Sequence, residues 1–321
     1  MSRLSRPIRL TLTAAALTAA VTLGAAAATA TAADVAQAPI TISPAFQDIT
    51  IAKDQAQKSF ELKVTNGSDA DVDYRLSALD FKSLNETGGV AFIGENPTKL
   101  EQKYDLASWL ILETNQITIP AHGSSQVKVI IDNRESLSPG GHYGAVLLTR
   151  VNLPSATGAD QVKLSQVLSS LLLVKKTGGE VYGLKLAGQQ PNGDLWSLPD
   201  TTTLRFQNTG NVHVVPRGAV KLIDPFGRVV KQGIINPESG NILPESFRRY
   251  ESSLDDLGVM PVPGWYHLRV SYRYDGSDVL TQADYGFFWL GWLWVAVIII
   301  VPIWILISAR QVSRWLRRHR V

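Results

Sequence analysis

The stretch FELKVTNGSDADVDYRL, residues 60–76, decides the fold class of this chain. Apolar and polar side chains alternate over residues 60–65 and again over residues 72–77. Between the two runs, residues 66–69 read Asn-Gly-Ser-Asp, which is typical of a turn. Alternation with period two indicates strands that bury one face. The stretch therefore predicts two neighbouring antiparallel strands with one face on a core.

The same pattern continues further along the chain. It recurs at residues 126–131 and 144–151, and residues 169–174 form a short apolar run that suits a covered strand. Two such sheets packed face to face make a sandwich. We therefore expect a first β-sandwich domain over residues 39–179. Residues 81–114 break the rhythm and predict a long insertion between strands, with a candidate helix at residues 103–112.

A second set of strand signals begins after Gly178 and Gly179. It comprises residues 181–186, 202–207, 212–223, 228–235, 247–253, 265–274 and 279–287. About seven short strands in about 100 residues, separated by Asn/Gly and Asp/Gly turns, are typical of an immunoglobulin-like sandwich. We expect this second domain over residues 180–286, with Tyr266 as its tyrosine corner.

Residues 287–309, FFWLGWLWVAVIIIVPIWILISA, contain no charged side chain. As a helix they would reach about 34 Å, enough to cross a hydrocarbon core of about 30 Å. Basic residues flanking a span stay in the cytoplasm, and the tail at residues 310–321 contains five arginines. A core helix of a soluble protein is the alternative, but it is rarely so long and free of charge. We predict a transmembrane helix and a basic cytoplasmic tail.

The first 32 residues have the layout of a secretory signal peptide. Three arginines precede an apolar, Ala-rich stretch, and small residues follow, so cleavage is expected after Ala30, Ala32 or nearby. The alternative is an uncleaved anchor. Together with the C-terminal span, the signal predicts a single-pass protein of the cell membrane. Its N-terminal domains would be extracellular and its C-terminus cytoplasmic.

Composition excludes several classes of chemistry. The chain has no cysteine, which rules out disulfides, thiol catalysis and cysteine-based metal sites. The net charge of +3 reflects arginines at the two ends, so it does not indicate nucleic-acid binding. The histidines lack metal-site spacing, and a calcium-like run from Asp69 has Tyr74 where the loop needs glycine. An S-x-x-K sequence at Ser125 falls in a strand. We expect no metal, no cofactor and no enzymatic activity.

Three exported residues are candidates for binding. Residues 140–144 read Gly-Gly-His-Tyr-Gly, and glycines that enter a strand permit a bulge or close backbone approach. His142 and Tyr143 within it could then pack on a ligand. Trp109 lies in the long insertion, and long loops on a rigid sandwich often carry binding. The alternative places Tyr143 and Trp109 in the core.

Several motifs in the first domain occur in a recognisable order. They include residues 43–44, 48–51, 63–66, 74–76, 107–110, 117–124 and 138–144. In this order, residues 39–152 resemble the N-terminal domain of WxL-interacting bacterial cell-surface proteins, a relative of pilus-chaperone-like immunoglobulin folds. That resemblance implies a first domain associated with peptidoglycan and a second associated with partner proteins. The second domain here departs from the family and looks like a generic immunoglobulin-like module.

The sequence thus predicts an all-β chain: two immunoglobulin-like β-sandwich domains outside the membrane and one C-terminal transmembrane helix. Its expected function is to bind cell-wall polymer or another surface protein. The alternative is a chaperone-like assembly factor for secreted or pilus-type subunits that works by β-strand complementation. The ligand, the envelope type and the oligomeric state stay open.

Overall fold

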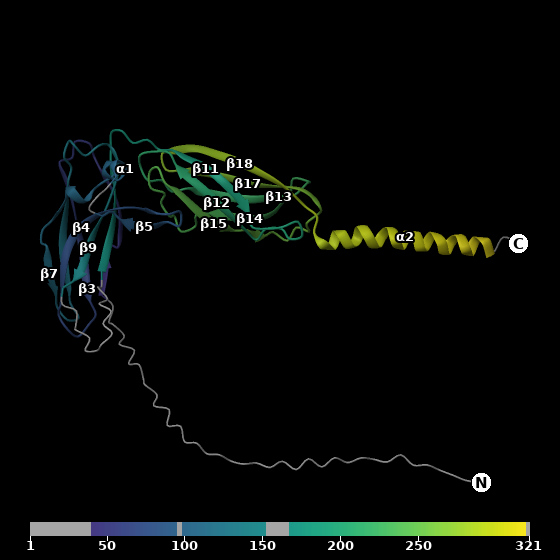
Figure 1. Cartoon of the computed structure of the whole chain (residues 1–321), viewed down its shortest axis with the longest axis horizontal. Coiled ribbons are helices and arrows are strands. Elements are labelled where there is room, and N and C mark those ends of the chain that lie inside the picture. Colours follow the sequence, from purple (N-terminus) through teal and green to yellow (C-terminus); the bar gives the residue numbers. More distant parts are fainter. Residues whose placement is uncertain (1–39, 95–97, 152–166, 319–321) are drawn as a thin grey trace, which may run out of the picture. The chain divides into compact units, whose positions relative to one another are not determined.

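The computed structural model describes residues 40–94, 98–151 and 167–318 (Figure 1). The predicted signal peptide lies outside these residues. The elements are β1 (Ile40–Ser43), β2 (Phe46–Ile51), β3 (Gln57–Asn66), β4 (Val72–Leu84), β5 (Gly89–Phe92), α1 (Lys99–Lys103), the 3₁₀ helix η1 (Ala107–Trp109), β6 (Leu110–Leu112), β7 (Gln116–Ile119), β8 (Ser124–Asp132), β9 (Gly140–Arg150), β10 (Val167–Lys176), β11 (Leu184–Pro191), β12 (Thr201–Asn208), β13 (Arg217–Ile223), β14 (Val229–Ile235), β15 (Phe247–Ser253), β16 (Asp255–Asp256), β17 (Gly264–Tyr274), β18 (Ser277–Trp289) and α2 (Trp292–Arg318). The prediction of an all-β chain with one C-terminal apolar helix is confirmed.

The strands up to β10 form the first sandwich. One sheet has the order β1-β3-β8-β6, and the other has the order β2-β10-β9-β4-β5 with β7 also paired to β4. The alternating apolar side chains of β3 face its core, where Leu62 and Val64 are fully buried and Phe60 is partly buried. Hydrophobic burial from both sheets therefore holds this sandwich together.

The first two strands, β1 and β2, belong to different sheets. β1 pairs antiparallel with β3 in one sheet, whereas β2 pairs parallel with β10 in the other. The pairing of β2 with β10 begins only at Leu171, where the backbone N–H donates to the carbonyl of Ala45 at 2.9 Å. The first four residues of β10 therefore lie beyond the reach of β2.

The second sandwich comprises β11 to β18. Its sheets have the orders β11-β12-β15 and β16-β14-β13-β17-β18, and Phe206 packs edge-on against Tyr250 and Tyr272 in its core. The hydroxyl of Tyr266 donates to the carbonyl of Val262 at 2.8 Å, four residues upstream. This is the hydrogen bond of a tyrosine corner, so that prediction is confirmed.

Both sandwiches contain a buried asparagine at the end of a central strand. Asn66 ends β3 and Asn208 ends β12, and they are 1% and 0% exposed. In each case the side-chain amide donates to backbone carbonyls of neighbouring loops, and the amide oxygen accepts a backbone N–H two residues on. A buried polar side chain satisfied in this way fixes the loop geometry at one end of the sandwich.

The long insertion has more regular structure than the sequence indicated. β4 continues to Leu84 and forms a hairpin with β5, so residues 81–84 are strand. The insertion contains one short α-helix, α1, which begins at a capping box formed by Thr98 and Glu101. This helix ends at Lys103, where the predicted helix was expected to begin. Leu110–Leu112 instead pairs with β8. The helix prediction for residues 103–112 was therefore wrong, because cross-strand pairing overrides the local pattern.

The C-terminal helix begins later than predicted. Residues 287–289 belong to β18, where they pair with β17, and Trp289 is buried in the second core. Gly291 then takes a φ of 66°, and α2 starts at Trp292. Among the described residues, α2 is the one helix long and apolar enough to cross a membrane, over Trp292–Trp315. An apolar strand and an apolar helix look alike in sequence, so pairing decided the boundary.

Candidate functional site

The three residues that the sequence singled out do not form one accessible site. His142 and Tyr143 lie on β9 and are 2% and 1% exposed, and Trp109 packs half-buried against the first core. The ring nitrogens of His142 lie 2.9 Å from the carbonyl oxygen of Asp105 and 2.8 Å from that of Ser138. His142 thus fastens two loops to β9. The side chain of His142 is thus fully engaged, while Tyr143, though almost fully buried, lines a cavity of about 300 Å³ together with Phe81 and Tyr104.

Tyr143 instead meets the second sandwich through His213. The Tyr143 hydroxyl lies 3.3 Å from Nδ1 of His213, and Nε2 of His213 lies 3.1 Å from the Asp48 carboxylate on β2. The two ring nitrogens of His213 therefore bridge the Tyr143 hydroxyl and the Asp48 carboxylate. Burial raises the pKa of Tyr143 well above its usual value, and the His213 hydrogen bond lowers that of Asp48. The hydroxyl therefore stays protonated and the carboxylate stays charged at neutral pH.

A second contact lies at the tip of the β4–β5 hairpin. Glu86 receives two hydrogen bonds from the guanidinium of Arg205 on β12, at 2.6 and 2.9 Å, and one ion pair from Arg249 on β15 at 2.6 Å. The backbone carbonyl of Glu86 also accepts from the Arg249 N–H at 2.8 Å. Bidentate arginine–carboxylate pairs fix orientation as well as position. The Arg205 hydrogen bonds lower the pKa of Glu86.

A third contact joins the insertion of the first sandwich to a loop of the second. The Glu245 carboxylate lies 2.8 Å from both the Lys103 ammonium and the Tyr104 hydroxyl. The hydrogen bond from Lys103 lowers the pKa of Glu245. Close by in sequence to Tyr143, the Gly141 N–H donates to the carbonyl of Asn211 at 2.8 Å. Three carboxylates and two backbone hydrogen bonds therefore hold the two sandwiches to each other.

We predict that the contacts between the sandwiches weaken at low pH, where these carboxylates become protonated. Glu86, Glu245 and Asp48 all have lowered pKa values, so their contribution is present above the ordinary values of 4.5, 4.5 and 3.8 and is lost as pH falls through the lower folded-state values. Spin labels at Ser59→Cys and Ser253→Cys, one exposed strand position in each sandwich, report the distance between them. We expect the distance distribution to broaden at about pH 3 relative to pH 7.

The control is the fold of each sandwich, followed by near-ultraviolet circular dichroism at both pH values. A distance distribution that stays equally narrow at low pH, with both sandwiches folded, would contradict the prediction.

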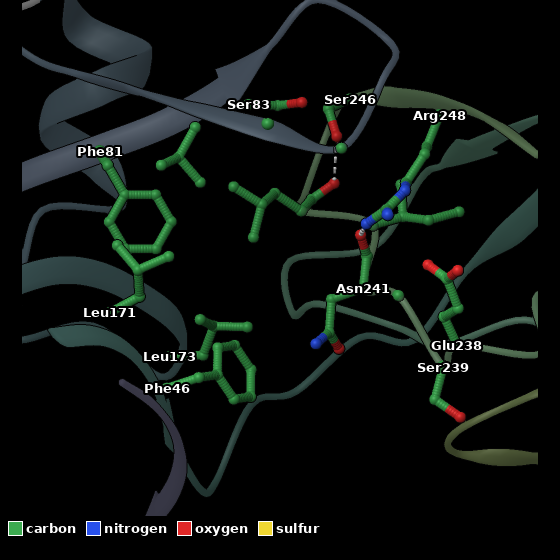
Figure 2. A pocket seen from close by; sticks show the side chains of 16 residues that line it. Phe46, Phe81, Ser83, Leu171, Leu173, Glu238, Ser239, Asn241, Ser246 and Arg248 are labelled. Atoms are coloured by element: carbon green, nitrogen blue, oxygen red, sulfur yellow. Dashed lines mark hydrogen bonds between the residues drawn. The ribbon is translucent and has the colours of Figure 1, made fainter. Parts of the chain in front are cut away.

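A cavity of about 320 Å³ lies between these contacts (Figure 2). Its apolar wall comes from the first sandwich and its polar wall from residues 238–248 of the second. The apolar side chains of the first sandwich are Phe46, Phe81, Val90, Leu171 and Leu173, and the second sandwich adds Ile242 and Leu243. On the polar wall, Nη1 of Arg248 donates to the Asn241 carbonyl at 2.7 Å and the Ser246 hydroxyl donates to the Leu243 carbonyl at 2.8 Å, as drawn in Figure 2. The cavity offers an apolar floor beside fixed polar groups.

An open strand edge lies beside this cavity. Among the described residues, no strand pairs with residues 167–170 of β10 on the side opposite β9. The Leu171 N–H points to that side, and alternate residues of a strand point the same way, so the backbone groups of Val167 and Ser169 face the open edge. Phe46, 46% exposed, stands at the start of β2 where the edge ends. The arrangement can accept an extended segment by strand addition.

The described residues offer little for covalent or metal chemistry. Within them, no group of three or more His, Asp or Glu side chains is placed to hold a metal ion. Asp69 and Asp71 of the calcium-like run instead bond to the loop at His122, through its imidazole and the Ala121 N–H. Ser125 of the S-x-x-K sequence donates to the Thr118 carbonyl. These residues stabilise turns and strands.

Sequence reasoning missed the residues that join the sandwiches. Asp48, Glu86 and His213 each lie on a different element, and the Asp48–His213 pair is separated by 165 positions in sequence. No local pattern marks such pairs. The sequence did indicate β10, because its short apolar run predicted a covered strand. The residue at which β2 begins to pair with it could not be predicted, since that depends on the position of β2.

No protein-family model and no curated protein matches the sequence. Among solved structures, the chain is similar to the class 5 fimbriae chaperone CfaA, with 11% identity, a TM-score of 0.42 and coverage of 77% of this chain and 98% of that one. It is also similar to the SafA pilin–SafB chaperone structure from Salmonella enterica (11% identity, TM-score 0.36, 78% and 96% covered) and the Pseudomonas aeruginosa chaperone CupB2 (11%, 0.33, 77% and 98%). All these TM-scores are below 0.5, and these similarities assign no function to the chain. The resemblance to WxL-interacting proteins stays a prediction.

Proposed function

We propose that this protein is a membrane-anchored assembly factor that holds an extended segment of another secreted or surface protein at the open edge of β10. The observation that carries the proposal is the row of outward-facing backbone groups at Val167 and Ser169, next to an apolar cavity. Backbone groups at a sheet edge pair with any extended chain, and nearby pockets select its side chains.

The anchor is the C-terminal helix. Arg310, Arg314, Arg317 and Arg318 follow its apolar part, and such residues stay on the cytoplasmic side. The two sandwiches would then lie outside the cytoplasm, where secreted partners pass. An anchored binding protein keeps its partner at the membrane surface.

The edge and the cavity together define what the partner segment must look like. A segment paired with residues 167–169 extends along the sheet up to Ser170, whose hydroxyl donates to the Pro44 carbonyl at 2.7 Å. Alternate side chains of the segment point to the face that carries Leu171 and Phe46. Apolar side chains at those positions would fill the cavity. Each edge hydrogen bond contributes about 0.5–1.5 kcal/mol, so several apolar contacts are needed for stable binding. We expect an extended segment with alternating apolar residues.

The contacts between the sandwiches support this function in a second way. They hold the polar wall of the cavity, on the second sandwich, against the apolar wall on the first. A site whose walls are already in place loses less entropy on binding.

Photocrosslinking in cells that produce the full-length chain tests the proposal. Benzoylphenylalanine replaces Phe46 at the mouth of the cavity and, as a control, the exposed Ile234 on β14. We expect a defined secreted or surface protein to be captured from position 46 and not from position 234. An adduct at position 46 that a muramidase shortens would instead support binding of cell-wall polymer.

A matched pair of variants at Ser169 decides whether the strand edge is used. Ser169→Pro removes the outward N–H and places the proline ring on the edge, while Ser169→Ala keeps the N–H. Neither change disturbs a β9–β10 hydrogen bond, because the backbone groups of Ser169 point away from β9. With benzoylphenylalanine at position 46, proline should lower the crosslink yield about tenfold, the equivalent of about 1.4 kcal/mol, and alanine should leave it unchanged. Equal yields from both variants would overturn the proposal.

A further inference from the structure

Three loops at one end of the second sandwich have tips without a charged side chain. They connect β11 to β12, β13 to β14, and β16 to β17, and their tips read LWSLP (residues 195–199), PFG (residues 225–227) and LGVMPVP (residues 257–263). At the tips, Phe226 is 75% exposed, Met260 73% and Trp196 50%. Large apolar side chains gathered on one exposed surface mark an interaction site.

In each loop an aspartate directly before the apolar tip accepts hydrogen bonds from backbone N–H groups of the loop. Asp194 accepts from the N–H groups of Trp196 and Ser197, and Asp224 accepts from those of Phe226 and Arg228. In the third loop, Asp256 likewise accepts from the N–H of Gly258. Carboxylates bound to the backbone in this way shape the loops and leave the tips apolar.

The loops lie against the beginning of α2. The N–H groups of Leu290 and Gly291 donate to the Leu195 carbonyl at 3.2 and 3.3 Å, and the Trp294 indole donates to the Pro261 carbonyl at 3.1 Å. The β13–β14 loop is at the same end, because Arg228 donates to the Met260 carbonyl at 3.4 Å. The tips are therefore level with the point where the apolar helix starts.

The length of the helix indicates how far this end approaches the membrane. Its charge-free part runs from Trp292 to residue 309, and 18 helical residues reach about 27 Å. A hydrocarbon core of about 30 Å is slightly thicker. Arg310 can extend its side chain toward the cytoplasmic interface, but little helix is left to separate the sandwich from the outer leaflet. The loop tips must then reach the interfacial layer.

A cavity of about 280 Å³ lies between the loops and the first turn of α2. Its lining is aromatic and aliphatic and includes Trp196, Met260, Pro261, Trp289, Trp292 and Leu293. Tryptophan is enriched where proteins meet the membrane interface.

We infer that this end of the second sandwich is a lipid-binding surface that inserts into the outer leaflet. Trp196, Phe226 and Met260 enter the interfacial layer, and an acyl chain of a bilayer lipid occupies the cavity beside Trp292. The surface continues the membrane contact of α2, and the inference therefore rests on the anchoring part of the proposed function. The second sandwich is then held in a fixed orientation on the membrane, which a flexible tether would not provide.

Collision measurements on spin labels in the full-length chain test this inference. The chain has no native cysteine, so Phe226→Cys and Met260→Cys each give one labelled site in vesicles of phosphatidylcholine and phosphatidylglycerol. Val279→Cys is the matched control, an apolar residue 71% exposed on β18 and about 34 Å along the strand from Trp289. Ile299→Cys within α2 is the reference for the span.

We expect labels at positions 226 and 260 to collide more with oxygen than with a water-soluble nickel chelate, as at position 299. The label at position 279 should show the opposite. If position 299 reports lipid while positions 226 and 260 match position 279, the lipid-binding surface is refuted and the anchor stands. If position 299 reports water, the anchor itself is refuted and this inference falls with it.

Discussion

Asn208→Ala is expected to destabilise the second sandwich by about 3–5 kcal/mol. The Asn208 amide donates to the carbonyls of Val212 at 2.7 Å and Ile242 at 2.9 Å, and its oxygen accepts the Gly210 N–H at 2.8 Å. The Val212 carbonyl and the Gly210 N–H would be left buried without a hydrogen bond, whereas the Ile242 carbonyl keeps the bond from the Val214 N–H at 3.1 Å. Each unsatisfied buried group costs about 1–3 kcal/mol, and partial relaxation of the loop keeps the total below the full sum.

The measurement is urea unfolding of the full-length chain in mild detergent, with hydrogen exchange to locate the change. Exchange should rise in β11 to β18 and stay unchanged in β3 to β9. Asn192→Ala is the control, because that exposed amide bonds only to threonine hydroxyls, and its effect should be within about 0.5 kcal/mol. Asn66→Ala should give the mirror result, with exchange rising in the first sandwich. A loss in both sandwiches from either variant would show that they do not unfold separately.

Tyr143→Ala is expected to cost about 3–5 kcal/mol, while Tyr143→Phe should cost about 1 kcal/mol. The ring is 1% exposed and lies 6.1 Å from Phe81, 6.3 Å from Tyr104 and 5.8 Å from His213, measured between ring centroids. Alanine removes all of this packing and leaves a cavity. Phenylalanine keeps the packing and removes only the hydroxyl beside His213.

Denaturant unfolding of both variants separates packing from hydrogen bonding. Val279→Ala, at an exposed position, serves as the control and should change stability little. The outcome also decides between the two sequence interpretations of Tyr143. A Tyr143→Ala chain of unchanged stability would contradict a core role and favour the ligand-binding role that its motif suggested.

The sequence predicted the strands well where one side of a strand faces water. The β15 prediction at residues 247–253 matches the strand in the structure, and the alternation at residues 60–65 identified β3 and its buried face. The tyrosine corner at Tyr266 also followed from local spacing. In each case the determining contacts are repeated at period two or lie within a few residues. Residues close in sequence are therefore sufficient to predict these strands and the tyrosine corner.

Prediction failed where a distant partner sets the outcome. Residues 103–112 looked helical, but Leu110–Leu112 pairs with β8. Residues 287–289 looked like the start of the membrane helix, but their pairing with β17 keeps them in β18. Apolar content is the same for a covered strand and a buried helix, so the neighbouring strand decides.

The sequence by itself determined the all-β class, the turns and one apolar C-terminal helix, because these depend on side-chain periodicity and on composition. Only the tertiary structure decided which residues carry the candidate site. The Asp48–His213 and Glu86–Arg205 contacts join residues 165 and 119 positions apart, and Tyr143 became part of an interface between sandwiches. The open edge at Val167 and Ser169 exists because β1 and β2 belong to different sheets, and a strand edge is defined by the partner that it lacks.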